Sequence, residues 1–134
     1  MRKEVLSDNC IYHVYNRGVD KRNIFLNDRD RERFIDGLIV FNDNNTVPVF
    51  KKRLKDIESG SYDREKIVDI LAFCLMPNHY HLLLRQRVEH GIANFMHKIG
   101  TGYVKYFNIL NDRPGTLFQG KFRAISVEYD RYFG

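Results

Sequence analysis

Two histidines, His79 and His81, are the residues of this chain whose type and spacing best suit chemistry. They open an apolar segment, residues 79–85, that follows a second apolar segment, residues 67–75, and a Pro77-Asn78 turn. Because side chains alternate along a β-strand, both histidines should project from the same face. Neutral imidazole is a good ligand for manganese, zinc and cobalt. The pair therefore predicts half of a metal site, which needs a third ligand, a carboxylate or amide oxygen. The alternative is two hydrogen-bonded, inert residues at a strand end.

The other histidines and the cysteines give weaker signals. His13 belongs to an expected strand and could lie near the pair across a sheet, although a structural role is favoured for it. We expect His90 and His97 to be surface or packing residues. Cys10 and Cys74 have no CxxC spacing, so neither a zinc knuckle nor a disulfide framework is expected.

The hydrophobic pattern predicts the elements that position the pair. Strands are expected at residues 10–17, 67–75, 79–85 and 117–127, and helices at 28–42 and 91–110, with a further helix beginning within 128–134. The order β-α-β-β-α-β predicts an α+β, ferredoxin-like fold, with a four-stranded antiparallel sheet and helices on one face. The other face of the sheet would then be open to a ligand.

The length of 134 residues predicts a single domain, residues 1–134. Residues 42–66 are polar and are expected to form a variable insertion, with a short basic helix at residues 51–57. Its charges are expected to form a solvated surface rather than a dedicated binding strip. No apolar run reaches membrane-span length, and the N-terminus lacks the apolar core of a signal peptide. These features predict a cytoplasmic protein with no membrane partner.

Basic and aromatic residues alternate between residues 97 and 123, and the formal net charge of the chain is +5. Cations that contact phosphates, beside rings that stack on unpaired bases, suit single-stranded or hairpin DNA. The alternative is that the rings are core and the charges a solvated rim. The DNA-binding candidates are Arg17, Arg22, Lys98, Lys105, Lys121 and Arg123.

Three motifs in the chain resemble one known family. They are Tyr12-His-Val-Tyr-Asn-Arg-Gly18, Pro77-Asn-His-Tyr-His-Leu-Leu-Leu84 and Gly115-Thr-Leu-Phe-Gln-Gly-Lys-Phe-Arg123. Together they resemble the single-tyrosine HUH transposases, in particular the REP-associated tyrosine transposases and the small transposases of single-strand insertion sequences. The resemblance covers nearly all of the chain outside residues 42–66.

The resemblance implies a ferredoxin-like fold and a divalent metal, Mg²⁺ or Mn²⁺, held partly by His79 and His81, with Tyr80 between them. It implies cleavage of single-stranded DNA beside a folded hairpin, through a 5′-phosphotyrosine that frees a 3′-OH and allows rejoining. The family includes dimers and monomers, and the sequence does not decide between them.

The C-terminal end departs from the family pattern. In that family, the nucleophilic tyrosine lies in a helix after the last strand, and an Asn four residues later can complete the metal shell. Residues 129–134 resemble the segment just before that motif, and Tyr132 matches a tyrosine that precedes the nucleophile. The nucleophile and third ligand are therefore expected beyond residue 134. A truncated sequence, a decayed element and a variant that uses another tyrosine all stay open. Tyr103 is the best substitute within the chain, although packing or stacking is its favoured role.

Two other functions compete with DNA transposition. One is a non-catalytic nucleic-acid-binding module on a ferredoxin-like sheet. The other is a zinc hydrolase built on the histidine pair, which no HExxH, second HxH or aspartate cluster supports. Metal-dependent formation of a covalent protein–DNA adduct would separate the three.

Overall fold

The structure is a computed structural model that describes residues 5–127. Its elements are β1 (Ile11–Arg17), the 3₁₀ helix η1 (Val19–Lys21), α1 (Asp28–Val40), α2 (Phe50–Glu58), β2 (Val68–Met76), β3 (His79–Gln86), α3 (Gly91–Leu110) and β4 (Arg123–Ser126). Within the described part of the chain, no helix combines the length and hydrophobicity needed to span a membrane.

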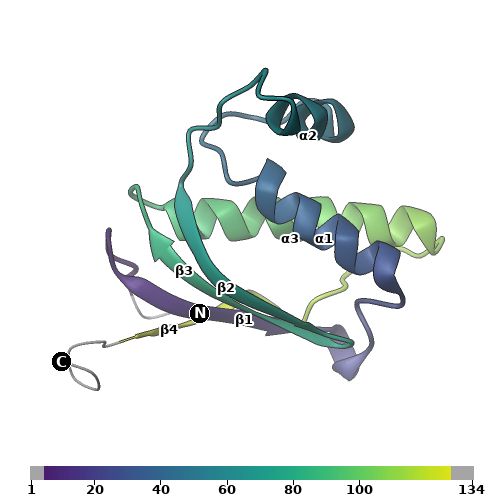
Figure 1. The fold of residues 1–134 in the computed structure, drawn as a ribbon. Coiled ribbons are helices and arrows are strands. Elements are labelled where there is room, and N and C mark those ends of the chain that lie inside the picture. Colours follow the sequence, from purple (N-terminus) through teal and green to yellow (C-terminus); the bar gives the residue numbers. More distant parts are fainter. Residues whose placement is uncertain (1–4, 128–134) are drawn as a thin grey trace.

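The four strands form one antiparallel sheet in the order β2-β3-β1-β4. β3 lies between β1 and β2, and β1 lies between β3 and β4, so two split β-α-β units interleave. Helices α1 and α3 cover the same face of this sheet, and α2 lies beyond them (Figure 1). The predicted α+β class, with a four-stranded antiparallel sheet and its helices on one face, is confirmed.

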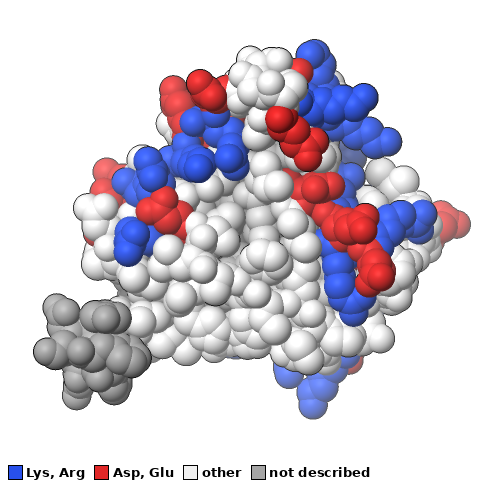
Figure 2. Space-filling model, in the orientation of Figure 1, with Lys and Arg blue, Asp and Glu red and all other residues white. Residues whose placement is uncertain are grey.

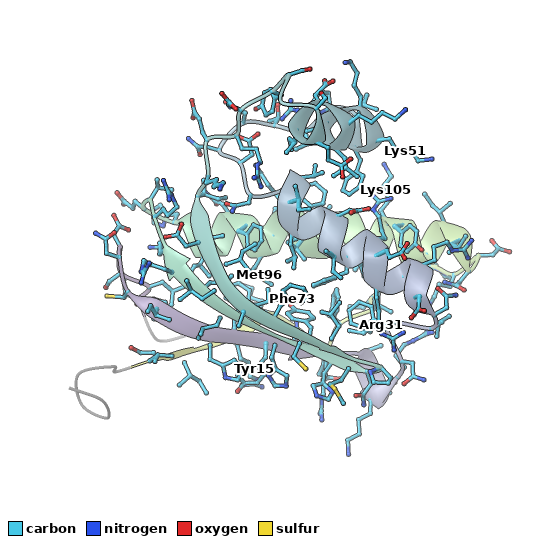
Figure 3. The ribbon with its side chains drawn as sticks, in the orientation of Figure 1. Tyr15, Arg31, Lys51, Phe73, Met96 and Lys105 are labelled. Carbon is cyan, nitrogen blue, oxygen red and sulfur yellow. The ribbon has the colours of Figure 1, made fainter. Side chains whose placement is uncertain are left out.

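Strand alternation separates the two faces of the sheet. Tyr12 and Val14 of β1, and Leu82 and Leu84 of β3, are buried against the helices, together with Phe95 of α3. Residues at the intervening positions of β1 and β3 are only partly buried. The face away from the helices is therefore the open face of the sheet. Tyr15 projects from it in Figure 3.

The expected last strand, residues 117–127, is wrong in its first half. β4 begins only at Arg123. Leu117 and Phe118 are buried, but they are joined to the sheet by a single bridge between Gly18 and Phe118. Gly120 has φ +68°, a left-handed conformation that a continuous strand does not allow. The helix expected to begin within 128–134 lies outside the described residues.

The segment 42–66 contains the expected short helix, which is α2. Many of its charged side chains lie on the surface over α2, as Figure 2 shows. Asp43 is an exception, because its side chain is 0% exposed. Its carboxylate accepts hydrogen bonds from Arg53 (3.1 Å) and Tyr62 (2.7 Å). The segment is therefore organised around a buried carboxylate, which its polar composition does not reveal.

Candidate metal and DNA-binding site

His79 and His81 are the first and third residues of β3, and both face the open side of the sheet. Their ring centroids are 5.0 Å apart and their planes are nearly perpendicular, at 89°. Tyr80 between them points the other way and is buried in the core. The prediction that the two histidines share one face is confirmed.

Each histidine of the pair has a hydrogen-bond partner at Nδ1. The Asn78 side-chain oxygen lies 2.7 Å from His79 Nδ1, and because an amide oxygen only accepts, His79 Nδ1 carries the proton. His81 Nδ1 lies 2.7 Å from His13 Nε2. Neither Nε2 atom of the pair has a protein partner among residues 5–127. Two imidazoles that are held at Nδ1, and whose Nε2 atoms contact no described protein group, fit two positions of a metal site.

The pKa of His81 is lowered from its ordinary value. Burial disfavours the charged ring, and His13 and His79 add repulsion to a positive charge there. A lowered pKa keeps the imidazole neutral, which is the form that binds a metal ion.

Among the described residues, no carboxylate joins the histidine pair as a third ligand. No group of three or more His, Cys, Asp or Glu side chains within residues 5–127 converges in a way that could hold a metal ion. The protein residues present therefore fit half of a site, and the zinc hydrolase alternative gains no ligand set here.

A pocket of about 390 Å³ lies beside the pair, between the end of β1 and the start of β4. Its lining residues are Tyr15, Asn16, Arg17, His79, Gln119 and Arg123. Two hydrogen bonds hold the loop before β4 against β1: Gln119 N donates to Arg17 O (2.8 Å), and Asn16 Nδ2 donates to Gly120 O (3.1 Å). The pocket combines a metal-ligand candidate with two cations and an aromatic ring.

The sequence interpretation missed Tyr15, Asn16 and Gln119 as site residues. Tyr15 pairs with His81 in the β1–β3 register, and its ring lies 5.9 Å from that of His81. The odd positions of β1 share a face, and this alternation was the available signal. The position of Gln119 depends on a contact between distant segments.

The six DNA-binding candidates differ in their place relative to the pocket. Four belong to the β1 end or to the β4 segment, and two belong to α3. Arg17 and Arg123 line the pocket. Lys121 is exposed two residues before Arg123, and Arg22 packs over the Phe107 ring, 5.2 Å from its centroid.

Lys98 and Lys105 lie on α3, on the helix-covered side of the sheet (Figure 3 labels Lys105). Lys98 Nζ donates to the carbonyl oxygens of Asp43 (2.5 Å) and Asn45 (3.1 Å). The sheet separates both lysines from the histidine pair, and their contact with DNA stays a prediction.

Tyr103 is placed in the core rather than at the site. It is 3% exposed, and its hydroxyl donates to the carbonyl oxygen of Ile24 (2.5 Å). The pKa of Tyr103 is raised well above its ordinary value, chiefly by burial. It lies between the sheet and α3, on the face opposite His79 and His81. These features favour the packing role, which is also the role that the sequence favours for Tyr103.

Replacing Tyr103 by phenylalanine should therefore affect stability and not DNA chemistry. Loss of one buried hydrogen bond should lower the free energy of unfolding by about 1 kcal/mol, as measured by urea denaturation. Any metal-dependent protein–DNA adduct should form as in the wild type. Loss of the adduct in a stably folded Tyr103→Phe protein would contradict this placement.

Several solved structures resemble this fold, and two of them are described here. One is a REP-associated tyrosine transposase bound to a REP hairpin, with a TM-score of 0.61 and 10% sequence identity, covering 96% of this chain and 62% of that one. This chain therefore spans less than two thirds of that relative. The other, described as a candidate transposase, is from Deinococcus radiodurans, with a TM-score of 0.55 and 15% identity, covering 98% and 89% of the two chains. At these identities the likeness shows the fold. Among curated proteins, none matches the sequence.

A sequence-family comparison is more specific than the likeness of fold. The family model described as "Transposase IS200 like" matches residues 6–132, which is nearly the whole chain. This match includes both the histidine pair and the strands that form the pocket beside it. The chain therefore belongs to the IS200-like transposase family.

Proposed function

We propose that this protein takes part in DNA transposition by cleaving and rejoining single-stranded, hairpin-bearing DNA through a tyrosine, with Mg²⁺ or Mn²⁺ held partly by His79 and His81. The observation that carries the proposal is the pair of open Nε2 atoms beside a pocket lined by Arg17 and Arg123. Membership of the transposase family and the hairpin bound to one structural relative support it.

The pocket supplies the groups that a single strand needs. Arg17 and Arg123 provide charge for phosphates, and the Tyr15 ring is available to stack on an unpaired base. The bound metal would neutralise the negative charge that develops on the scissile phosphate. None of the helices within residues 5–127 covers this face of the sheet (Figure 1), so these helices leave it open to a strand.

The chemical step is a transesterification. A tyrosine oxygen forms a bond to phosphorus, the bond from phosphorus to the 3′ oxygen breaks, and the proton lost by the phenol is balanced by one gained at the 3′-OH. The 5′-phosphotyrosine keeps the energy of the broken ester, so a 3′-OH can reverse the step without a high-energy cofactor. The nucleophile and third ligand are expected outside residues 5–127.

The test uses the protein as its gene encodes it, with hairpin-bearing single-stranded DNA labelled at its 3′ end, in the fragment that would become attached to tyrosine. With Mn²⁺, a labelled band that survives denaturing electrophoresis is expected, and a chelator present from the start of the reaction should prevent its formation. Hairpin binding without an adduct in Mg²⁺ or Mn²⁺ would overturn the proposal and favour the non-catalytic binding module.

Arg17 and Arg123 should dominate phosphate contact near the histidine pair. Each Arg→Ala change should weaken hairpin binding and reduce the slope of log affinity against log salt by about 1. A titration of affinity against salt measures both effects. Lys105→Ala is the matched control, because it removes a cation on the other side of the sheet. An equal effect of Lys105→Ala would contradict the assignment of the DNA to the open face.

A further inference from the structure

His13 and His81 come from neighbouring strands and lie diagonally across the open face. In the β1–β3 register His13 pairs with Leu83, and Tyr15 pairs with His81. The His13 and His81 rings stack with centroids 4.9 Å apart and planes at 22°. The Tyr15 ring lies 5.0 Å from the His13 ring. His13 therefore approaches His81 in a defined orientation, with Nε2 only 2.7 Å from His81 Nδ1.

A hydrogen bond between two neutral imidazoles contains one proton and can be made in two ways. If His13 Nε2 donates, the proton of His81 must be on Nε2, and that atom cannot bind a metal. If His81 Nδ1 donates, the Nε2 lone pair of His81 is open. His79 has no such choice, because its partner is the amide oxygen of Asn78. Of the two histidines, only His81 has a partner that can either donate or accept, so only its tautomer depends on that partner.

We infer that His13 is a positioning residue that accepts the Nδ1 proton of His81 and so keeps His81 Nε2 open for a divalent cation. The inference rests on the proposed metal-binding role of the pair. His13 itself then carries its proton on Nδ1 and needs no contact with metal or DNA. Metal-binding histidines in proteins commonly donate their second ring nitrogen to such a partner, which fixes both tautomer and ring orientation.

Two replacements of His13 separate acceptance of the proton from simple packing. His13→Phe keeps an aromatic ring against His81 and Tyr15 but removes the acceptor. His13→Gln keeps an acceptor, its side-chain oxygen, without the ring. His97→Phe, at an exposed position on α3, is the matched control. Thermal unfolding of each variant establishes that it folds.

The first readout is Mn²⁺ binding to the full protein without DNA, measured by calorimetry. His13→Phe should weaken binding by about 10- to 100-fold, His13→Gln should restore most of it, and His97→Phe should leave it unchanged. Wild-type affinity in a folded His13→Phe protein would overturn the inference.

The second readout is metal-free, which separates this inference from the proposed function. Long-range ¹H–¹⁵N NMR, at a pH well above the ordinary pKa of histidine, reports which nitrogen of His81 is protonated. Nδ1 should carry the proton in the wild type and in His13→Gln, and His13→Phe should lose this preference. A wild-type proton on Nε2 of His81 would overturn the inference whatever the metal result. Absence of Mn²⁺ binding by a wild type with the expected tautomer would count against the metal proposal alone.

Discussion

Replacement of His79 or His81 by alanine should abolish metal-dependent adduct formation while hairpin binding persists. Each change removes one of the two open Nε2 atoms that face the same side of the sheet. A bound metal lowers the barrier to phosphoryl transfer by several kcal/mol, and about 1.4 kcal/mol corresponds to a tenfold change in rate. We therefore expect the rate of adduct formation to fall on the order of a thousandfold or more in either variant.

The measurement is a single-turnover time course of adduct formation with Mn²⁺, paired with hairpin affinity in the absence of metal. The control is His97→Ala, because His97 is exposed on α3 and contributes nothing to the open face. An adduct that forms at the wild-type rate in folded His79→Ala and His81→Ala proteins would exclude the pair from catalysis. A parallel loss of hairpin binding would indicate instead that the histidines contact DNA directly.

Replacement of Asp43 by alanine should cause a large loss of stability. The carboxylate is fully buried and forms an ion pair with the Arg53 guanidinium at 3.1 Å. The Arg53 side chain is itself only 14% exposed. It also accepts hydrogen bonds from Tyr62 and from the backbone N–H groups of Asn45 and Glu65. Removing one partner of a buried ion pair leaves the other charge uncompensated and costs about 3–5 kcal/mol. Urea denaturation at neutral pH measures this free energy of unfolding.

The pH dependence of this contribution follows from the pKa of Asp43. Burial alone raises that pKa, but the hydrogen bond from Tyr62, those from the Asn45 and Glu65 backbones, and the charge of Arg53 outweigh burial. The pKa in the folded protein therefore lies below its ordinary value. The contribution is complete above the unfolded-state pKa, about 3.9, and is lost as pH falls through the lower folded-state pKa.

The control for both measurements is the pair Asp43→Asn and Asp63→Asn. Asp43→Asn should destabilise the protein at neutral pH, and its difference from the wild type should shrink at pH values below the unfolded-state pKa. Asp63 is exposed, so its replacement should change stability by less than about 0.5 kcal/mol. A difference for Asp43→Asn that stays constant down to strongly acidic pH would contradict the role of its charge.

Local pattern was sufficient for most of the architecture. The period-two alternation of residues 79–85 put His79 and His81 on one face, and helical spacing located α1 and α3. The short basic helix expected at residues 51–57 is also present, as α2. These features depend on neighbours in sequence, so they can be recognised before any contact is known. The fold class then followed from the order of the elements.

The prediction of a continuous strand from 117 to 127 was wrong in its first half, because the apolar residues there are set by contacts with distant segments. Leu117 and Phe118 are apolar because they are buried in the core, and not because they extend a strand. An apolar run records burial, and burial can be achieved by a loop as well as by a strand. Gly120, with its left-handed backbone, interrupts the segment before β4 begins.

By itself the sequence determined the transposase family, the sheet and the histidine pair on one strand. Only the tertiary structure decided which residues meet that pair. The β1–β3 register brings His13 and Tyr15 to His81, and the β1–β4 register, which pairs Tyr15 with Arg123, brings Arg123 to the pocket that Arg17 lines. The tertiary structure also places Lys98, Lys105 and Tyr103 on the helix-covered side of the sheet, away from the pair. The physical reason is range: alternation is fixed by the geometry of consecutive residues, whereas register and partner choice come from contacts between distant segments.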